Sequence, residues 1–308
     1  MPASPSPLAD LSAAARAAAA VAGPATVAIG RHSRGTGVVV APGRVLTNAH
    51  NLRDRTTQVT FAEGRTAQGR VAGTDPDHDL VALDVDTADI APLAFAEGEL
   101  AEGDPVFAVA RTPRGQRVTF GLVSAVDRAF RGPRGRRVKG AVEHTAALAR
   151  GSSGGPLVNA EGQIVAINTH RLGEGFYLAQ PADADLRRRV ERLAGGADLG
   201  GRRLGVAIVA AEESARMRRQ VGLPDRSGLL VAGVVEGSPA SEAGLDEGDL
   251  IVSVGGAPVT SVDDVWDALD AAGDTVELEV VRGTETRTVS VSYTGPADGE
   301  APGEGSDA

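Results

Sequence analysis

Between two short apolar runs the sequence reads GSSGGPL (residues 151–157), a glycine- and serine-rich turn. Acyl transfer by a serine needs an exposed hydroxyl on a tight turn and backbone N–H groups aimed at the developing oxyanion. Small residues permit that geometry. Because the apolar runs at 157–158 and 164–167 are typical of strands, a flexible Gly/Ser linker is disfavoured. The stretch predicts a nucleophile turn with Ser153 as the reactive residue.

The order of the other polar residues separates two classes of serine hydrolase. The stretch also satisfies G-x-S-x-G, the nucleophile elbow of α/β-hydrolases, in which the acid and the histidine follow the serine. Downstream of Ser153 the only histidine is His170, 17 residues away in an expected β-hairpin. The elbow interpretation therefore fails, and an esterase is the weaker hypothesis. Chymotrypsin-like folds use the order His, Asp, Ser, which this chain supplies.

A base and an acid for this order lie upstream. The run VLTNAH (residues 45–50) carries His50 at the tip of an apolar strand, where a general base would be held rigidly. The acid must orient the imidazole and stabilise the imidazolium. Asp75, Asp77 and Asp79 crowd one turn. Asp79 is favoured because the strand 80–83 follows it directly and would anchor it beside the core.

Composition predicts the fold class. Of the 308 residues, 42% are hydrophobic and 3% aromatic, and 40 are glycines, which favours β-structure with tight turns over a helical bundle. The absence of cysteine excludes a disulfide framework and a thiolate metal site, and we expect no metal and no cofactor. Regularly spaced short strands predict antiparallel barrels or sandwiches. The expected strands are 26–29, 37–41, 58–61, 80–85, 105–110, 116–126, 139–143, 156–158, 163–169 and 176–179.

Charge divides the chain in two. Residues 1–200 hold 23 Lys/Arg against 21 Asp/Glu, whereas residues 201–308 hold 8 against 20, which predicts a boundary near residue 200. A net charge of −10 also disfavours nucleic-acid binding. The predicted parts are an N-terminal helix or extension (1–23), a first domain (24–195), a linker (196–202), a second domain (203–293) and a disordered acidic tail (294–308).

Helical patterns are short. The Ala-rich run 12–23 has no basic residue ahead of it and is interrupted by Arg16, so it predicts a surface helix rather than a signal peptide. No run reaches the ~18 apolar residues of a membrane span. We expect a cytoplasmic location, or a periplasmic or extracellular one if a leader precedes the chain. Residues 182–193 predict a helix, and Ser261 is expected to cap another through Ala271.

Three motifs together resemble the HtrA (Deg) proteases, trypsin-like serine enzymes with one or more PDZ domains. The stretches 45–50, 75–85 and 151–159 are close to the family patterns T-N-x-H, D-x-x-x-D-L-A-x-L and G-N-S-G-G-P-L-x-N. The resemblance covers roughly residues 20–293. It implies a mainly β fold, in which a double antiparallel β-barrel trypsin-like domain is followed by a small α+β PDZ domain.

The resemblance also implies roles for single residues. His50 would be the base, Asp79 the orienting acid and Ser153 the nucleophile in the hydrolysis of unfolded or damaged proteins. The oxyanion hole would form in the turn Gly151, Ser152 and Ser153, through the N–H groups of Gly151 and Ser153. A non-catalytic alternative stays open, a resting PDZ-containing chaperone or peptide-binding scaffold, because HtrA-like proteins can rest with a distorted oxyanion loop.

The expected substrate pocket departs from the family pattern. The segment EHTAALAR (143–150) replaces a more common Q-T-D-A-x-I-N-P run, which lines the primary specificity pocket in the family. Ala147 stands where trypsin has its acidic selector, so small or aliphatic substrate residues are expected rather than Arg or Lys. The pocket residues implied by the resemblance are Ala147, Leu148, Asn168, Thr169 and His170.

The second domain resembles a PDZ module. GSPASEAGL (237–245) followed by GDLI (248–251) is close to the family pattern G-S-P-A-x-x-A-G-L-x-x-G-D-x-I. The resemblance implies that backbone N–H groups of a loop capture a C-terminal carboxylate while the peptide adds to a sheet edge as a strand. In that loop an arginine replaces the usual aromatic, which favours an anionic terminus. The loop residues are Arg203, Leu204, Gly205 and Val206.

The sequence leaves two further questions undecided, the oligomeric state and the role of a basic run. Family trimers pack N-terminal aromatic residues against each other, whereas the first aromatic here is Phe61, so assembly as a homo-trimer is undecided. A basic run between expected strands is either a regulatory loop for an anionic ligand or a solvated loop. Its cations are Arg128, Arg131, Arg134, Arg136, Arg137 and Lys139.

Overall fold

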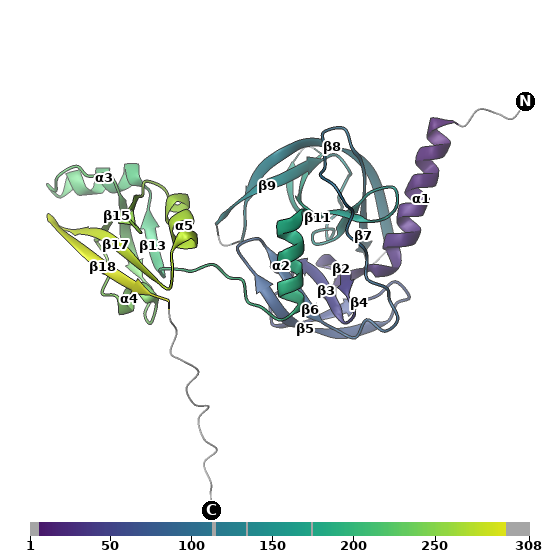
Figure 1. Cartoon of the computed structure of the whole chain (residues 1–308), viewed down its shortest axis with the longest axis horizontal. Coiled ribbons are helices and arrows are strands. Elements are labelled where there is room, and N and C mark those ends of the chain that lie inside the picture. The colour runs from purple at the N-terminus through teal and green to yellow at the C-terminus, as the bar shows by residue number, and fades with distance from the viewer. Residues whose placement is uncertain (1–5, 113–114, 134, 174, 294–308) are drawn as a thin grey trace, which may run out of the picture. The chain divides into compact units, whose positions relative to one another are not determined.

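The computed structural model describes residues 6–112, 115–133, 135–173 and 175–293 (Figure 1). The chain divides into two compact units, Met1–Gly200 and Gly201–Ala308. The predicted acidic tail, residues 294–308, lies outside the described residues, as does Arg134 of the basic run. Among the described helices, none has the length and apolar composition needed to cross a membrane.

Six antiparallel strands close the first barrel in the order β1-β2-β3-β6-β5-β4. Strand β3 pairs with β6 over its whole length, from Arg44 opposite Asp84 to Asn48 opposite Leu80. Strand β5 was not predicted, because glycines weaken the strand pattern of its sequence, TAQGRVAGTD. The strands are β1 (Thr26–Ile29), β2 (Gly35–Ala41), β3 (Arg44–Asn48), β4 (Thr56–Thr60), β5 (Thr66–Asp75) and β6 (Leu80–Asp84).

A second closed barrel follows in the order β10-β11-β12-β9-β8-β7. Most of the basic run belongs to the β8–β9 hairpin, because β8 extends to Arg131 and β9 begins at Arg137. The predicted fold class, mainly β with two antiparallel barrels and a small α+β domain, is confirmed. The strands are β7 (Pro105–Thr112), β8 (Gly115–Arg131), β9 (Arg137–His144), β10 (Pro156–Val158), β11 (Ile164–Gly173) and β12 (Phe176–Pro181).

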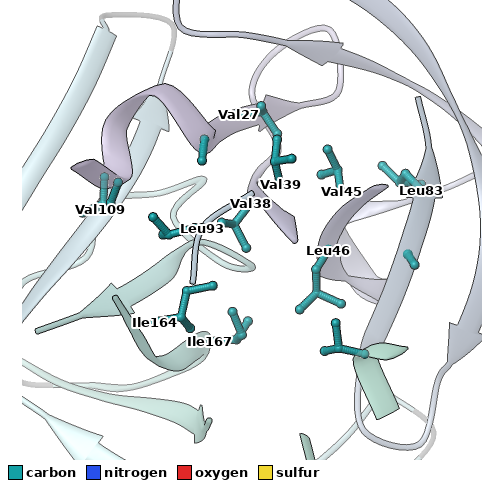
Figure 2. Packing of buried hydrophobic residues seen from close by; sticks show 14 of the residues in the cluster. Val27, Val38, Val39, Val45, Leu46, Leu83, Leu93, Val109, Ile164 and Ile167 are labelled. Atoms are coloured by element: carbon teal, nitrogen blue, oxygen red, sulfur yellow. The ribbon is translucent and has the colours of Figure 1, made fainter. Parts of the chain in front are cut away.

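One hydrophobic core joins the two barrels (Figure 2). Val38 and Leu46 of the first barrel belong to the same buried cluster as Val109, Ile164 and Ile167 of the second. All five side chains are fully buried, and each such side chain contributes about 1.5–3 kcal/mol by leaving water. This core fixes the two barrels against each other, so residues at their junction keep a defined geometry.

Two helices flank the barrels. Helix α1 (Pro7–Ala25) is longer than predicted and buries small residues such as Ala18 and Ala22. Near its end the buried guanidinium of Arg111 donates to the carbonyls of Gly23 at 2.9 Å and Thr26 at 2.7 Å. Helix α2 (Ala184–Ala194) begins two residues later than predicted, after Asp183, whose side chain caps it.

The second unit is a small α+β domain. Its sheet has the order β13-β14-β15-β17-β18, with β16 paired to β15. The predicted cap is present, since Ser261 and Asp264 form a capping box at the start of α5. Helix α3 was not predicted. The elements are β13 (Val206–Val209), α3 (Ala211–Gln220), β14 (Leu229–Val234), α4 (Pro239–Glu242), β15 (Leu250–Val254), β16 (Ala257–Pro258), α5 (Val262–Ala271), β17 (Thr275–Arg282) and β18 (Glu285–Ser292).

Candidate active site

His50 and Asp79 meet at one end of the first barrel because β3 and β6 are paired. His50 lies in the short 3-10 helix η1 (Ala49–Asn51) after β3, and Asp79 immediately precedes β6. The Nδ1 atom of His50 lies 2.5 Å from Oδ2 of Asp79, and the His50 backbone N–H donates to Oδ1 at 2.9 Å. Asp79 is fully buried. A buried carboxylate therefore orients both the ring and the backbone of the histidine.

The backbone of Asp79 has an uncommon conformation, with φ at +57°. Aspartate adopts this left-handed region more readily than most residues, yet it is still strained. Its carbonyl accepts hydrogen bonds from Nδ2 of Asn48 at 2.9 Å and from the N–H of Ala49 at 3.0 Å. Thr169 donates from its hydroxyl to Oδ2 at 3.3 Å. The surrounding bonds hold the acid in the position that faces His50.

The three candidate acids of the turn have different partners. The carboxylate of Asp75 accepts from Arg189 at 2.8 Å and lies 3.0 Å from the ring of His78. Burial opposes ionisation of Asp75, but these two partners outweigh it and lower its pKa. Asp77 lies 3.6 Å from Arg136 of the β8–β9 hairpin. Of the three acids, Asp79 is the one bonded to His50.

Ser153 lies in the turn that leads into β10 of the second barrel. Its hydroxyl donates to the carbonyl of Thr169 at 2.6 Å. Gly151 and Gly154 both have positive φ, +83° and +82°. A Cβ at Gly154 would lie 2.4 Å from the carbonyl oxygen of Thr36, so the close approach of the first barrel also requires glycine there. Backbone conformation and close packing therefore explain why the sequence motif has glycine at these positions.

Two first-barrel residues that the sequence analysis did not single out hold the Ser153 turn. The N–H of Thr36 and the Nδ2 of Asn51 both donate to the carbonyl of Ser153, each at 2.9 Å. The Thr36 hydroxyl donates to the carbonyl of Gly151 at 2.7 Å. Both side chains are buried. The available signal was a polar residue inside an apolar strand and another beside His50, since buried polar groups require partners.

The backbone of the turn offers donors to an oxyanion. Within the described residues, the N–H groups of Gly151 and Ser153 donate no hydrogen bond to the protein, whereas the N–H of Ser152 donates to Ala149 at 3.2 Å. Neighbouring N–H groups beside a reactive serine are what a developing oxyanion requires. Gly151 and Ser153 therefore fit the predicted oxyanion hole better than Ser152 does. In the same described ranges no group of three or more acids and histidines is arranged for a metal ion.

The predicted pocket residues differ in exposure. Ala147 is exposed and Leu148 is half-buried. Asn168 and Thr169 are buried, and Thr169 accepts from Ser153 while donating to Asp79, so both support the site from behind its surface. The side chain of His170 lies outside the described residues, although its backbone belongs to β11.

The side chain of Asn168 is held by a hydrogen bond to the buried His144. Nε2 of His144 lies 2.9 Å from Oδ1 of Asn168, whose Nδ2 donates to the carbonyl of Gly155 at 3.0 Å. The ring of His144 stacks on Tyr177 with 5.7 Å between ring centres. Burial is the main cause that lowers the pKa of His144 to about 4. The imidazole is therefore neutral near pH 7 and supports Asn168, whose backbone is hydrogen-bonded to Gly154 and Gly155 of the Ser153 turn.

The predicted carboxylate-binding loop leads into an edge strand of the second unit. Strand β13 ends the strand order and pairs with β14. Gly205 has a φ of +81°, and a Cβ there would lie 2.2 Å from that of Ser238. The guanidinium carbon of Arg203 lies 5.5 Å from the centre of the Trp266 ring on α5. A tight glycine loop followed by an edge strand suits the addition of a peptide as a further strand.

Comparisons with known proteins agree with this geometry. Residues 35–167 match the trypsin-like peptidase domain family, and residues 230–282 match the PDZ domain family. The chain is 30% identical to serine protease HTRA1 of Xenopus tropicalis, covering 84% of this chain and 59% of that protein. It is 31% identical to HhoA of Synechocystis sp., covering 84% of this chain and 70% of that protein. The chain belongs to the HtrA family of serine proteases.

A further relative and two solved structures are also similar to this chain. The mitochondrial serine protease HTRA2 of Bos taurus is 31% identical, and the chain covers 60% of its length, so the chain spans about three fifths of HTRA1 and HTRA2. The HtrA-type protease AlgW with a decapeptide superposes with a TM-score of 0.67 at 22% identity, covering 90% of this chain and 97% of that one. The serine endoprotease from Yersinia pestis superposes with a TM-score of 0.61 at 26% identity, covering 90% and 96%.

Proposed function

We propose that this HtrA-family chain is a serine endopeptidase that hydrolyses peptide bonds through an acyl-enzyme, with Ser153, His50 and Asp79 as its triad. The observation that carries the proposal is the buried Asp79 carboxylate bonded to both Nδ1 and the backbone N–H of His50. This arrangement fixes the imidazole tautomer with its proton on Nδ1, so Nε2 is the nitrogen that takes a proton from serine.

The steps follow from these roles. Ser153 Oγ attacks the scissile carbonyl and gives its proton to Nε2 of His50, and the buried Asp79 stabilises the imidazolium. The negative charge that forms on the carbonyl oxygen is met by the N–H groups of Gly151 and Ser153. His50 then protonates the leaving amine, and a water molecule repeats the sequence to release the acyl group. No step needs a metal or a cofactor.

Unfolded or damaged proteins are the proposed substrates. An extended backbone reaches a serine at the junction of two barrels more readily than a folded surface does. We expect small or aliphatic side chains in the pocket at Ala147 and Leu148, because neither residue offers a charge. In the second unit, the loop 203–206 and β13 would bind C-termini of substrates or regulators. A cytoplasmic location stays a prediction, and assembly as a homo-trimer stays undecided.

One observation favours a resting, chaperone-like alternative. The Ser153 hydroxyl donates to the carbonyl of Thr169 at 2.6 Å, and a proton held there is withdrawn from transfer to His50. A protein locked in this state would bind peptides through its second unit without cleaving them. Exposing the wild type to a C-terminal peptide separates a switchable enzyme from a scaffold.

Cleavage of casein by the wild type and by Ser153→Ala, each with and without a C-terminal peptide, tests the proposal. We expect fragments from the wild type in at least one condition and none from Ser153→Ala. Intact casein in every wild-type sample, with the protein folded by circular dichroism, would refute the endopeptidase and support the scaffold.

A further inference from the structure

A cationic pocket lies beside the candidate active site in the first barrel. It is a cavity of about 660 Å³ between the β1–β2 turn and the segment that follows η1. Three arginines, one histidine and one aspartate supply its charged and titratable lining, while threonines and glutamines supply much of the rest. The five are Arg31, His32, Arg34, Arg53 and Asp54.

The two chain segments that form this pocket also contact the Ser153 turn. Asn51 lines the pocket and donates from Nδ2 to the carbonyl of Ser153 at 2.9 Å. Ser33 lies in the chain between the lining residues His32 and Arg34, and its carbonyl oxygen lies 2.5 Å from the position that a Cβ would take at Gly151. The pocket therefore adjoins both the nucleophile and the proposed oxyanion hole.

The chemistry of the site determines which part of a substrate reaches this pocket. His50 protonates the leaving amine, so the residues after the scissile bond lie on the side of His50. The residue before that bond points to the predicted pocket at Ala147 and Leu148, which belongs to the second barrel. The cationic pocket lies in the first barrel, directly after His50. It is thus on the leaving-group side of the scissile bond.

The charge of the pocket is not neutralised by the protein. Arg31, Arg34 and Arg53 are exposed, and none of them forms an ion pair with a carboxylate of the described residues. Asp54 is the single acid of the lining. With three arginines against one acid, the charged lining of the pocket is net positive. Guanidinium groups bind carboxylates with paired hydrogen bonds, so the lining suits an acidic group.

We propose that Arg31, Arg34 and Arg53 select substrates with Asp or Glu within the first few residues after the scissile bond. The inference rests on the proposed endopeptidase function and adds a specificity to it. A carboxylate can come from an acidic side chain or from the free C-terminus of a short product. The pocket takes the side chain, because an endopeptidase cleaves within chains and leaves the terminus at variable distance.

The test uses internally quenched peptides that share every residue up to the scissile bond. The second and third positions after the bond carry Glu, Gln or Lys in three peptides with amidated C-termini, and a fourth peptide repeats the Gln sequence with a free C-terminus. At low salt we expect the wild type to cleave the Glu peptide about five- to tenfold faster, in kcat/KM, than the Gln peptide, and the Lys peptide slowest. The preference should shrink at high ionic strength, because the arginines are exposed.

Substitutions of the arginines test whether the pocket causes the preference for Glu peptides. The triple change Arg31→Gln, Arg34→Gln, Arg53→Gln should cleave the Glu and Gln peptides at equal rates, and Arg34→Glu should move the preference toward Lys. Arg16→Gln is the matched control, since Arg16 is an exposed arginine of α1, and it should keep the wild-type preference. Thermal unfolding checks that all variants are folded.

The outcomes separate this inference from the function on which it rests. Equal cleavage of the three peptides by the wild type, or an unchanged Glu preference in the triple variant, overturns the pocket assignment while the endopeptidase stands. A preference for Gln peptides with free rather than amidated C-termini, without a Glu effect, assigns the pocket to a terminal carboxylate and overturns the side-chain proposal. No cleavage of any peptide overturns both proposals.

Discussion

The first barrel holds its two candidate catalytic residues with its own strands, whereas the second barrel relies on the first to hold Ser153. His50 and Asp79 follow and precede the paired strands β3 and β6. The Ser153 turn is rich in glycine, and its carbonyls accept hydrogen bonds from Thr36 and Asn51 of the other barrel. Base and acid are thus assembled locally, while their alignment with the nucleophile depends on contacts between barrels.

This difference has a physical basis. Adjacent strands fix the separation of residues at their ends, so a histidine after β3 and an aspartate before β6 come together when that pair forms. A turn with positive φ at two glycines has many accessible conformations when it is isolated. The shared hydrophobic core of Figure 2 brings the two barrels together, and the buried polar bonds then select one conformation of the turn.

The largest expected effect comes from a substitution that breaks the His50–Asp79 pair. Asp79→Asn should lower kcat by about 10³–10⁴-fold, because an amide cannot stabilise the imidazolium and favours the wrong tautomer. Asp77→Asn is the matched control from the same turn, and it should change kcat by less than about tenfold. Steady-state kinetics on a peptide substrate measures both. Equal losses in the two variants would show that the turn matters as a whole and that Asp79 has no special role.

The folded protein should lose stability at low pH because the buried His144 of the second barrel resists protonation. Its pKa of about 4 lies below the ordinary value of 6.5, so between these pH values the unfolded chain binds the proton and the folded chain does not. Stability should therefore fall as pH decreases from about 6.5 to about 4, by on the order of 3 kcal/mol. Below that window the contribution of His144 is constant.

Urea unfolding of the wild type and of His144→Gln over this pH range isolates the effect. The difference in unfolding free energy between the two proteins should shrink as the pH falls, because glutamine does not titrate. The pKa of Asp75 is lowered below 3.8, so its contribution is lost at lower pH and leaves this window largely unaffected. A difference that is constant with pH would contradict a buried, neutral His144.

A smaller effect tests the contacts between barrels. Thr36→Val removes the hydroxyl that donates to Gly151 and keeps the backbone N–H, so we expect kcat to fall about 10- to 100-fold with little change in KM. Thr36→Ser keeps the hydroxyl and should restore most of the rate. Thr60→Val, a change in β4 of the same barrel, is the control for the substitution itself. If Thr36→Ser lost as much rate as Thr36→Val, the effect would come from packing and not from the hydrogen bond to Gly151.

The predictions for the catalytic residues rest on local sequence pattern and on the family resemblance. Ser153 follows from a glycine-rich motif between strands, and His50 from its place at a strand tip. Asp79 could be preferred over its neighbours because a strand follows it. In each case the deciding features lie within a few residues of the candidate.

The remaining features depend on residues distant in sequence. The bond from Thr36 to Gly151 joins positions 115 residues apart, and no local pattern specifies it. The separate partners of Asp75 and Asp77 likewise come from α2 and from the β8–β9 hairpin. Strand β5 was missed because its glycines hide the strand pattern, and the burial of Asn168, one of the predicted pocket residues, is not specified by its neighbours in the sequence.

Reaction with a fluorophosphonate, followed by mass spectrometry of the intact protein and its peptides, tests the central claim most directly. An aligned triad activates one serine, so the wild type should gain a single adduct on Ser153. Asp79→Asn and Thr36→Val should react more slowly, and Ser153→Ala should not react. A wild type that stays unmodified with a C-terminal peptide present, or that carries its adduct on another residue, would contradict the account.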